Sequence, residues 1–365
     1  MSLPTTATAT PVTSTVHHAP VVGWADPARQ QAFERWLATL ASHRLDPASL
    51  RAASADASFR RYLRIDAVDR SFVVMDAPPP QEDVRPFVHV AHLIEQAGLN
   101  APRVLAQDAE HGFLLLTDLG SQPYLAALRG AIDEGEPGHA DSLMRDAFGA
   151  LLAWQQRIDP SSLPPYDDAL LRRELALFPE WCVGREHGIG WNAVQHAQWQ
   201  GVCDLLVASA LAQPCVAVHR DFMPRNLMVC EPNPGILDFQ DAVAGPITYD
   251  AASMLRDAFI SWDEEQEIDW AVRYWQQARQ VGLPLDADFG EFWRQLEWMG
   301  LQRHLKVLGI FCRLKHRDAK PAYSKDLPRF FRYARRAAGR YNAFGALLRL
   351  LDQLEGVETK VGYTF

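Results

Sequence analysis

Short apolar runs separated by turn residues fill much of the first third of the chain. Runs this short, rich in Val, Leu and Phe, are typical of β-strands, because helices need longer stretches with a period of 3.6 residues. A helix is predicted before them at 26–42, with Asp26 as N-cap and Pro27 in its first turn. A second helix is predicted at 83–96, which Gly98 ends. The runs predicted as strands are residues 62–65, 71–75, 104–106 and 112–120.

From residue 121 onward the apolar residues recur at helical spacing. The pattern predicts an α+β protein with two folded parts, a mixed α/β part at 25–120 and a mainly helical part at 121–365. Residues 1–24 are rich in Thr, Ala, Pro and Val and almost uncharged, so they are predicted to be a disordered tail. The helices predicted in the second part are residues 141–155, 170–183, 191–212, 249–262, 264–281, 289–312 and 327–354.

Residues 216–250 interrupt this helical pattern. The apolar run 215–218 leads into a polar turn that contains Asp221 and Asn226, and a second short apolar run leaves that turn. A turn rich in Pro, Asn and Gly at 232–235 then returns the chain to Asp238. Two short strands joined by a tight turn would place these three polar side chains around one small volume.

Two carboxylates and an amide oxygen at this spacing suit phosphoryl transfer. We predict that Asp221 is catalytic and orients or deprotonates the attacking hydroxyl, because such a transfer depends mainly on positioning and charge neutralisation. Asn226 and Asp238 are the predicted ligands of Mg²⁺, since both offer hard oxygen atoms. His219 is predicted to stabilise the loop at 219–226, and Asp250 to orient it from behind.

Charge and composition exclude several classes of protein. The net charge of −9 argues against a general nucleic-acid binder. No window of 18 residues is continuously apolar, so no membrane span is predicted, and the N-terminus has neither the charge nor the apolar block of a signal peptide. The five cysteines lie far apart, which fits reduced thiols, and no His or Cys spacing indicates zinc. We therefore predict a cytoplasmic protein.

The residues around this polar turn resemble a known family. His219-x-Asp221-x-x-x-x-Asn226 followed by Asp238 is similar to the catalytic core of the protein-kinase-like fold. The sequence 237–240 (LDFQ) stands where protein kinases have Asp-Phe-Gly, and the later Gly-Pro and Asp250 resemble the aminoglycoside phosphotransferase and choline kinase branch. The resemblance implies a small N-lobe that binds ATP, a large helical C-lobe, and Mg²⁺ as a cofactor. Arg220 stands where small-molecule phosphotransferases often have glycine.

The same resemblance implies two nucleotide-binding segments. One is the loop that covers the phosphates, which here contains small residues but no glycine, and the other is a hinge whose backbone binds adenine. Where relatives place a phosphate-binding lysine, this chain has Met75, so Arg60, Arg61, Arg64 or the metal ion must neutralise the phosphates. An inactive pseudokinase is the alternative. The predicted nucleotide-binding residues are Ser58, Phe59, Arg60, Arg61, Thr117, Asp118 and Leu119.

Four further segments narrow the resemblance to bacterial anomeric cell-wall sugar kinases. These kinases convert N-acetylmuramate and N-acetylglucosamine to their α-1-phosphates in peptidoglycan recycling, and they also have Met-Asp at the strand end. A small-molecule sugar substrate and a functional link to a sugar-1-phosphate uridylyltransferase are therefore implied. The segments are 56–62 (DASFRRY), 74–79 (VMDAPP), 237–242 (LDFQDA) and 255–259 (LRDAF).

The acceptor is constrained mainly by charge. Residues 301–345, which we call the basic segment, contain twelve Lys or Arg and only two acidic residues. One explanation of the basic segment is a solvated helix face. If the segment instead lines the acceptor site, its positive charge favours a neutral or anionic acceptor over a polycationic aminoglycoside. The predicted acceptor contacts are Glu174, Arg256, His304 and Arg313, for which salt bridges between helices are an equal alternative. Phosphotransfer to another small hydroxyl compound (aminoglycoside, choline or homoserine) stays open.

Overall fold

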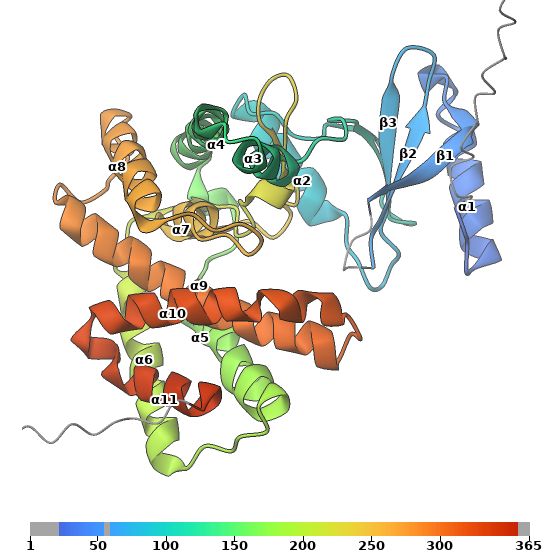
Figure 1. The fold of residues 1–365 in the computed structure, drawn as a ribbon. Coiled ribbons are helices and arrows are strands. Elements are labelled where there is room, and N and C mark those ends of the chain that lie inside the picture. The colour runs from blue at the N-terminus through green and yellow to red at the C-terminus, as the bar shows by residue number, and fades with distance from the viewer. Residues whose placement is uncertain (1–21, 55–58, 357–365) are drawn as a thin grey trace, which may run out of the picture. The chain divides into compact units, whose positions relative to one another are not determined.

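The computed structural model describes residues 22–54 and 59–356, and these form two units (Figure 1). The first unit runs to Val84 and also contains Val104–Asp118, whereas the second contains Arg85–Arg103 and all residues from Leu119 onward. Nearly all of the predicted disordered tail lies outside the described residues. The predicted helix at 83–96 thus belongs to the second unit, although it precedes two strands of the first.

An antiparallel sheet of five strands makes up most of the first unit, in the order β1-β2-β3-β5-β4. The four predicted strands are confirmed, but β1 was not predicted. Its sequence, DPASLRAAS, lacks apolar alternation and contains proline, which strands tolerate at a sheet edge, where β1 lies. The strands are β1 Asp46–Ser54, β2 Arg61–Asp66, β3 Ser71–Asp76, β4 Val104–Asp108 and β5 Phe113–Thr117.

Helix α1 (Pro27–Ala38) packs against this sheet and supplies its hydrophobic core. Asp26 caps the helix as predicted, since its side chain accepts a hydrogen bond of 2.8 Å from the amide of Ala28. The rings of Phe33 and Trp36 both lie 5.5 Å from the ring of Phe113 on β5. The helix is shorter than predicted, because residues 41–43 form a separate 3-10 turn.

The second unit is mainly helical, as predicted (Figure 1). Helix α4 begins one turn earlier than predicted, because Pro137 takes the first helical position. Asp141, the predicted cap, instead accepts a hydrogen bond from the indole of Trp270. The helices are α2 Arg85–Gln96, α3 Tyr124–Asp133, α4 Pro137–Arg157, α5 Asp168–Leu175, α6 Ala193–Leu211, α7 Tyr249–Leu255, α8 Glu264–Gln280, α9 Phe289–His316, α10 Leu327–Arg340 and α11 Gly345–Glu355.

Two segments predicted as single helices are interrupted. After α5 the chain continues as a π-helix, Phe178–Glu186, because Pro179 has no amide hydrogen to donate to the preceding turn. Between α10 and α11 the residues Asn342–Phe344 form a 3-10 turn. None of the helices in the described part of the chain is both long and apolar enough to cross a membrane.

Two small antiparallel strand pairs carry the polar turn of the second unit. Strand β6 (Cys215–Val218) pairs with β9 (Val243–Pro246), whose strand character was not predicted. Strand β7 (Leu227–Met228) pairs with β8 (Gly235–Ile236), with Leu227 opposite Ile236, as the predicted tight turn requires. These pairs fix both ends of the loop at 219–226, and Asp238 is the second residue after β8.

Candidate active site

The structure brings the three predicted catalytic and metal-binding residues together. Asp221 follows β6, Asn226 ends the 3-10 turn Pro224–Asn226, and Asp238 follows β8. The side-chain amide of Asn226 donates to the backbone oxygen of Asp221 at 3.0 Å and to Oδ2 of Asp238 at 3.3 Å. One amide group therefore ties residues 219–226, which we call the catalytic loop after their predicted role, to Asp238.

These hydrogen bonds also fit a divalent cation. Both use Nδ2 of Asn226, so the amide is fixed with Oδ1 as the atom that can bind a metal ion. Gln240 donates to Oδ1 of Asp238 at 3.0 Å and orients that carboxylate. Asp238 has a left-handed backbone (φ 62°), a conformation that Asp adopts more readily than most residues. The residues present thus suit Mg²⁺, which prefers hard oxygen ligands and retains open positions for phosphate and water.

Asp250 holds the start of the catalytic loop through its backbone. Its two carboxylate oxygens accept the amide hydrogens of His219 at 2.7 Å and of Arg220 at 3.0 Å. Asp250 lies in the first turn of α7 and is fully buried. Burial raises the pKa of Asp250 to about 7, against the effect of these two hydrogen bonds. The predicted role of Asp250 in orienting the loop is therefore supported by direct contacts.

His219 is a buried, neutral part of the same loop. Its ring contacts those of Trp154 and Phe222, with ring centroids 5.7 and 5.6 Å away. Nδ1 accepts a hydrogen bond of 3.3 Å from the amide of Asp221, so the proton of the neutral ring is on Nε2. Burial lowers the pKa of His219 to about 4. The basic nitrogen of this neutral imidazole, Nδ1, already accepts a hydrogen bond from the loop. His219 therefore stabilises the loop and does not act as a base.

Arg220 adopts a backbone conformation that usually favours glycine. Its φ is 75°, a left-handed conformation that glycine adopts without a steric cost. Its guanidinium is held by the Glu174 carboxylate at 2.5 Å and by the backbone oxygen of Asp241 at 3.3 Å. The ion pair with Glu174 thus holds Arg220, which has a strained backbone conformation, beside Asp221.

Glu174 is the centre of a buried cluster. Besides Arg220, its carboxylate binds Nζ of Lys306 at 2.9 Å and accepts a hydrogen bond from the hydroxyl of Tyr166. Burial alone would raise the pKa of Glu174, but the charges of Lys306 and Arg220 outweigh it and lower this pKa to about 2. The carboxylate is thus ionised and fully engaged with protein groups. Its predicted contact with an acceptor stays a prediction.

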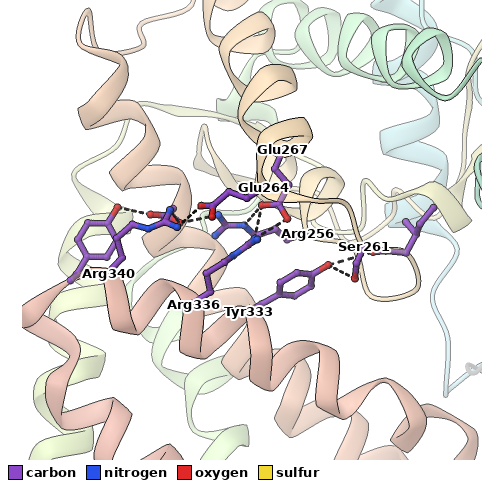
Figure 2. Close-up of polar contacts among 10 residues, drawn as sticks. Arg256, Ser261, Glu264, Glu267, Tyr333, Arg336 and Arg340 are labelled. Carbon is purple, nitrogen blue, oxygen red and sulfur yellow. Dashed lines mark hydrogen bonds and ion pairs between the residues drawn. The ribbon is translucent and has the colours of Figure 1, made fainter. Parts of the chain in front are cut away.

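The other predicted acceptor residues lie on α9 or next to it. Arg256 follows α7, is fully buried and binds Glu267 on α8 at 3.0 Å and Glu297 on α9 at 2.9 Å, so the alternative of salt bridges between helices is confirmed for it. Figure 2 shows Arg256 and Arg336 both pointing to the Glu267 carboxylate. His304 is buried and stacks on Tyr333 at 4.9 Å.

Arg313 is half-buried near the end of α9, and burial lowers the pKa of its guanidinium. As acceptor contacts, Arg256, His304 and Arg313 stay predictions. Sequence reasoning missed two other cations of the same helix, Arg303 and Lys306. The signal that would have found them is a run of polar residues in the middle of an apolar helix: Gln302, Arg303, His304 and Lys306, all buried.

The predicted nucleotide-binding residues of the first unit are held by local ion pairs. Arg61 donates to Asp76 at 2.9 Å, Arg64 lies 2.6 Å from Asp118, and Arg60 lies 3.5 Å from Glu82. If one of these arginines binds phosphate, its guanidinium must therefore interact with the phosphate and with its carboxylate partner at the same time. Their role in replacing the missing lysine stays a prediction.

The remaining nucleotide-binding predictions are placed as follows. Phe59 is exposed just before β2, whereas Ser58 lies outside the described residues. Thr117 ends β5, opposite Phe72 of β3. The chain passes from the first unit to the second between Asp118 and Leu119, which is where a hinge is expected.

This arrangement, a small antiparallel sheet unit and a helical unit with an Asp, an Asn and a second Asp at one loop, defines a protein-kinase-like phosphotransferase fold. A family model described as the phosphotransferase enzyme family matches residues 49–292. The chain belongs to this family. The predicted fold class, the predicted family and the prediction of an enzyme that transfers phosphoryl groups are confirmed.

Individual relatives agree with this assignment. An N-acetylmuramate/N-acetylglucosamine kinase of Pseudomonas aeruginosa is 51% identical over 342 residues, which are 91% of this chain and 99% of that protein. The ADP-bound aminoglycoside phosphotransferase APH(2'')-Ib has a TM-score of 0.53 at 14% identity, over 85% of this chain and 98% of its own. Amicoumacin kinase, solved with AMP-PNP and Ca²⁺, has a TM-score of 0.56 at 15% identity, over 83% and 92%. The two solved structures show the fold alone.

Proposed function

We propose that this protein transfers the γ-phosphoryl group of ATP to the anomeric hydroxyl of N-acetylmuramate and of N-acetylglucosamine, giving the α-1-phosphates. The observation that carries the proposal is the joint placement of Asp221, Asn226 and Asp238 in a chain so similar to kinases named for these two sugars. The reaction belongs in the cytoplasm, where it would serve peptidoglycan recycling and supply a sugar-1-phosphate uridylyltransferase.

The residues of the catalytic loop divide the work of the transfer. Asp221 orients the anomeric hydroxyl and accepts its proton as the new O–P bond forms and the bond to ADP breaks. Oδ1 of Asn226 and the carboxylate of Asp238 would hold Mg²⁺, which neutralises the charge on the phosphates when bound. His219 and Asp250 position Asp221 through the backbone, since each is buried and bound to loop amides.

The fixed geometry of the loop supports activity over the pseudokinase alternative. Asp221 is held from both sides, by the amide of Asn226 at its carbonyl and by Nδ1 of His219 at its own amide. Such preorganisation is what phosphoryl transfer requires from a protein, because little covalent chemistry is left for side chains to perform.

The proposal is tested by following the products of the purified full-length chain by ³¹P NMR. We expect Mg-ATP and N-acetylmuramate to give ADP and a sugar-phosphate resonance coupled to the anomeric proton. Choline, homoserine and an aminoglycoside serve as competing acceptors in parallel samples. Phosphorylation of one of these, with both amino sugars unchanged, would refute the assigned substrate and leave the phosphotransferase class intact. No turnover with any acceptor would favour the pseudokinase.

A further inference from the structure

Three cationic side chains are buried in the described part of the chain, and one of them has no counter-ion. Arg256 is 0% exposed, Arg303 3% and Lys306 8%. Arg256 pairs with two glutamates and Lys306 with Glu174. No carboxylate oxygen of the described residues lies within 4.0 Å of Arg303, and its buried Nη1 has no hydrogen-bond partner there. A buried charge without a partner is costly, so a missing anion is the natural explanation.

Arg303 shares a face of α9 with the lysine that binds Glu174. It precedes Lys306 by three residues, and residues at this spacing share one face of a helix. Lys306 in turn binds Glu174, the residue that holds Arg220 beside Asp221. The charge of Arg303 also opposes the rise that burial causes in the pKa of Asp250, whose carboxylate binds the loop. Arg303 is thus electrostatically coupled to the site of phosphoryl transfer.

A second unpartnered group lies near Arg303. Asp257 is fully buried, and its Oδ1 accepts the amide hydrogens of Phe259 at 2.7 Å and of Ile260 at 3.0 Å. Its Oδ2 has no hydrogen-bond partner among the described residues. Burial raises the pKa of Asp257, and the charge of Arg303 opposes that rise, although no ion pair joins the two residues.

This turn also touches the catalytic loop directly. The guanidinium of Arg225, in the 3-10 turn of the loop, lies 5.0 Å from the centre of the Phe259 ring. Polar groups that are buried beside a reaction centre and lack partners in the free protein are typical of a substrate subsite, since the substrate supplies the missing bonds. A guanidinium nitrogen and a carboxylate oxygen that both lack partners suit a ligand that has both an anionic group and a hydrogen donor.

We propose that Arg303 binds the carboxylate of the lactyl group of N-acetylmuramate, with Asp257 Oδ2 accepting a hydrogen from the same sugar. The inference rests on the proposed function, and it explains how the enzyme distinguishes its two sugar substrates. N-Acetylmuramate differs from N-acetylglucosamine by this lactyl ether alone, so an arginine that binds the carboxylate acts on one substrate and not on the other. Arg303 is therefore a specificity-determining residue, distinct from the predicted Arg313.

The test compares kcat and KM for both sugars in Arg303→Gln, Arg303→Lys and the wild type. A hydrogen-bonded charge contact is worth roughly a 10- to 100-fold change in affinity, so we expect KM for N-acetylmuramate to rise by about that factor in Arg303→Gln. KM for N-acetylglucosamine should change less than about twofold, and Arg303→Lys should recover part of the loss. Arg332→Gln, an exposed arginine on α10, is the matched control and should leave both values unchanged.

The possible results separate the inference from the function on which it rests. Equal losses with both sugars would overturn the inference, because Arg303 would then act on the phosphates or on the fold. If Arg303→Gln does not fold, the ratio of the two KM values in Arg303→Lys decides, and an unchanged ratio counts against the inference. A wild-type enzyme that phosphorylates neither sugar would instead refute the proposed function. Thermal unfolding of each variant identifies a purely structural effect.

Discussion

The carboxylate of Glu174 lies 2.5 Å from the guanidinium of Arg220 and thereby holds a residue with φ of 75° next to Asp221. Arg220 must keep this conformation for the catalytic loop to keep its shape, and the sheet pairs β6–β9 and β7–β8 fix only the ends of that loop. The ion pair between Glu174 on α5 and Arg220 therefore stabilises both the fold and the site. Its strength depends on the ionisation of Glu174, which makes it testable by pH.

We expect Glu174→Gln to destabilise the protein more at neutral pH than in acid. Because the folded pKa of Glu174, about 2, lies below the ordinary value of 4.5, ionisation stabilises the fold above pH 4.5 and this gain is lost as the pH falls toward 2. A difference of this size corresponds to about 3 kcal/mol at pH 7. Urea unfolding at pH 7 and at pH 3 measures it, and a pH-independent difference between variant and wild type would contradict the assigned ionisation.

Replacement of Asp221 by Asn is expected to separate binding from turnover. The variant keeps the size and the hydrogen bonds of the backbone at this residue but cannot accept the proton of the acceptor, so kcat should fall by roughly 10²- to 10⁴-fold. Affinity for a non-hydrolysable ATP analogue should stay within about threefold of the wild type, because Asp221 is not assigned to the nucleotide. Asp204→Asn, in an exposed ion pair on α6, is the control. Wild-type turnover in Asp221→Asn would exclude Asp221 as the catalytic residue.

The fall of kcat on the acid side of its pH profile (the acid limb) should follow the protonation of Asp250. Burial raises its pKa to about 7, with Asp221 adding to the rise and Arg303 opposing it. Above this pKa the carboxylate accepts both loop amides, of His219 and Arg220, whereas protonation weakens these bonds and loosens the loop. We therefore expect kcat to fall as the pH drops through about 7. Asp250→Asn should be less active and lack this limb, and a limb of unchanged position in that variant would assign it to another group.

The sequence was most informative where the site is local. Asp221, Asn226 and Asp238 lie within one strand-turn-strand segment, so turn chemistry alone places them together. Glu174 and Lys306 are on helices far apart in the chain, and nothing in the sequence pairs them, although they form an ion pair and Glu174 also binds Arg220. Their contact depends on how the helices pack, which periodicity does not determine.

Secondary structure was likewise predictable where it depends on the local sequence and was missed where it depends on packing. Strand β1 was missed because its sequence has no apolar alternation, and its partner β2 supplies the missing hydrogen bonds. The helix predicted at 170–183 ends at Leu175, since Pro179 has no amide hydrogen to donate to that residue, but the π-helix Phe178–Glu186, which packs against α9, is not set by the local sequence. The capped helix at Asp26 was predicted correctly because cap, proline and apolar stripe agree locally.

Removal of Asn226, the predicted metal ligand, should raise the Mg²⁺ concentration that the reaction requires and leave the fold of the nucleotide site unchanged. Asn226→Ala deletes Oδ1 and also the two bonds that its amide makes to Asp221 and Asp238. Asn226→Asp retains an oxygen ligand but loses those bonds, so the pair of variants separates metal binding from loop positioning. We expect the Mg²⁺ concentration for half-maximal rate to rise at least about tenfold in Asn226→Ala and less in Asn226→Asp. Titration of the rate with Mg²⁺ at saturating ATP measures it, and an equal metal requirement in all three proteins would show that Asn226 positions Asp221 without binding the ion.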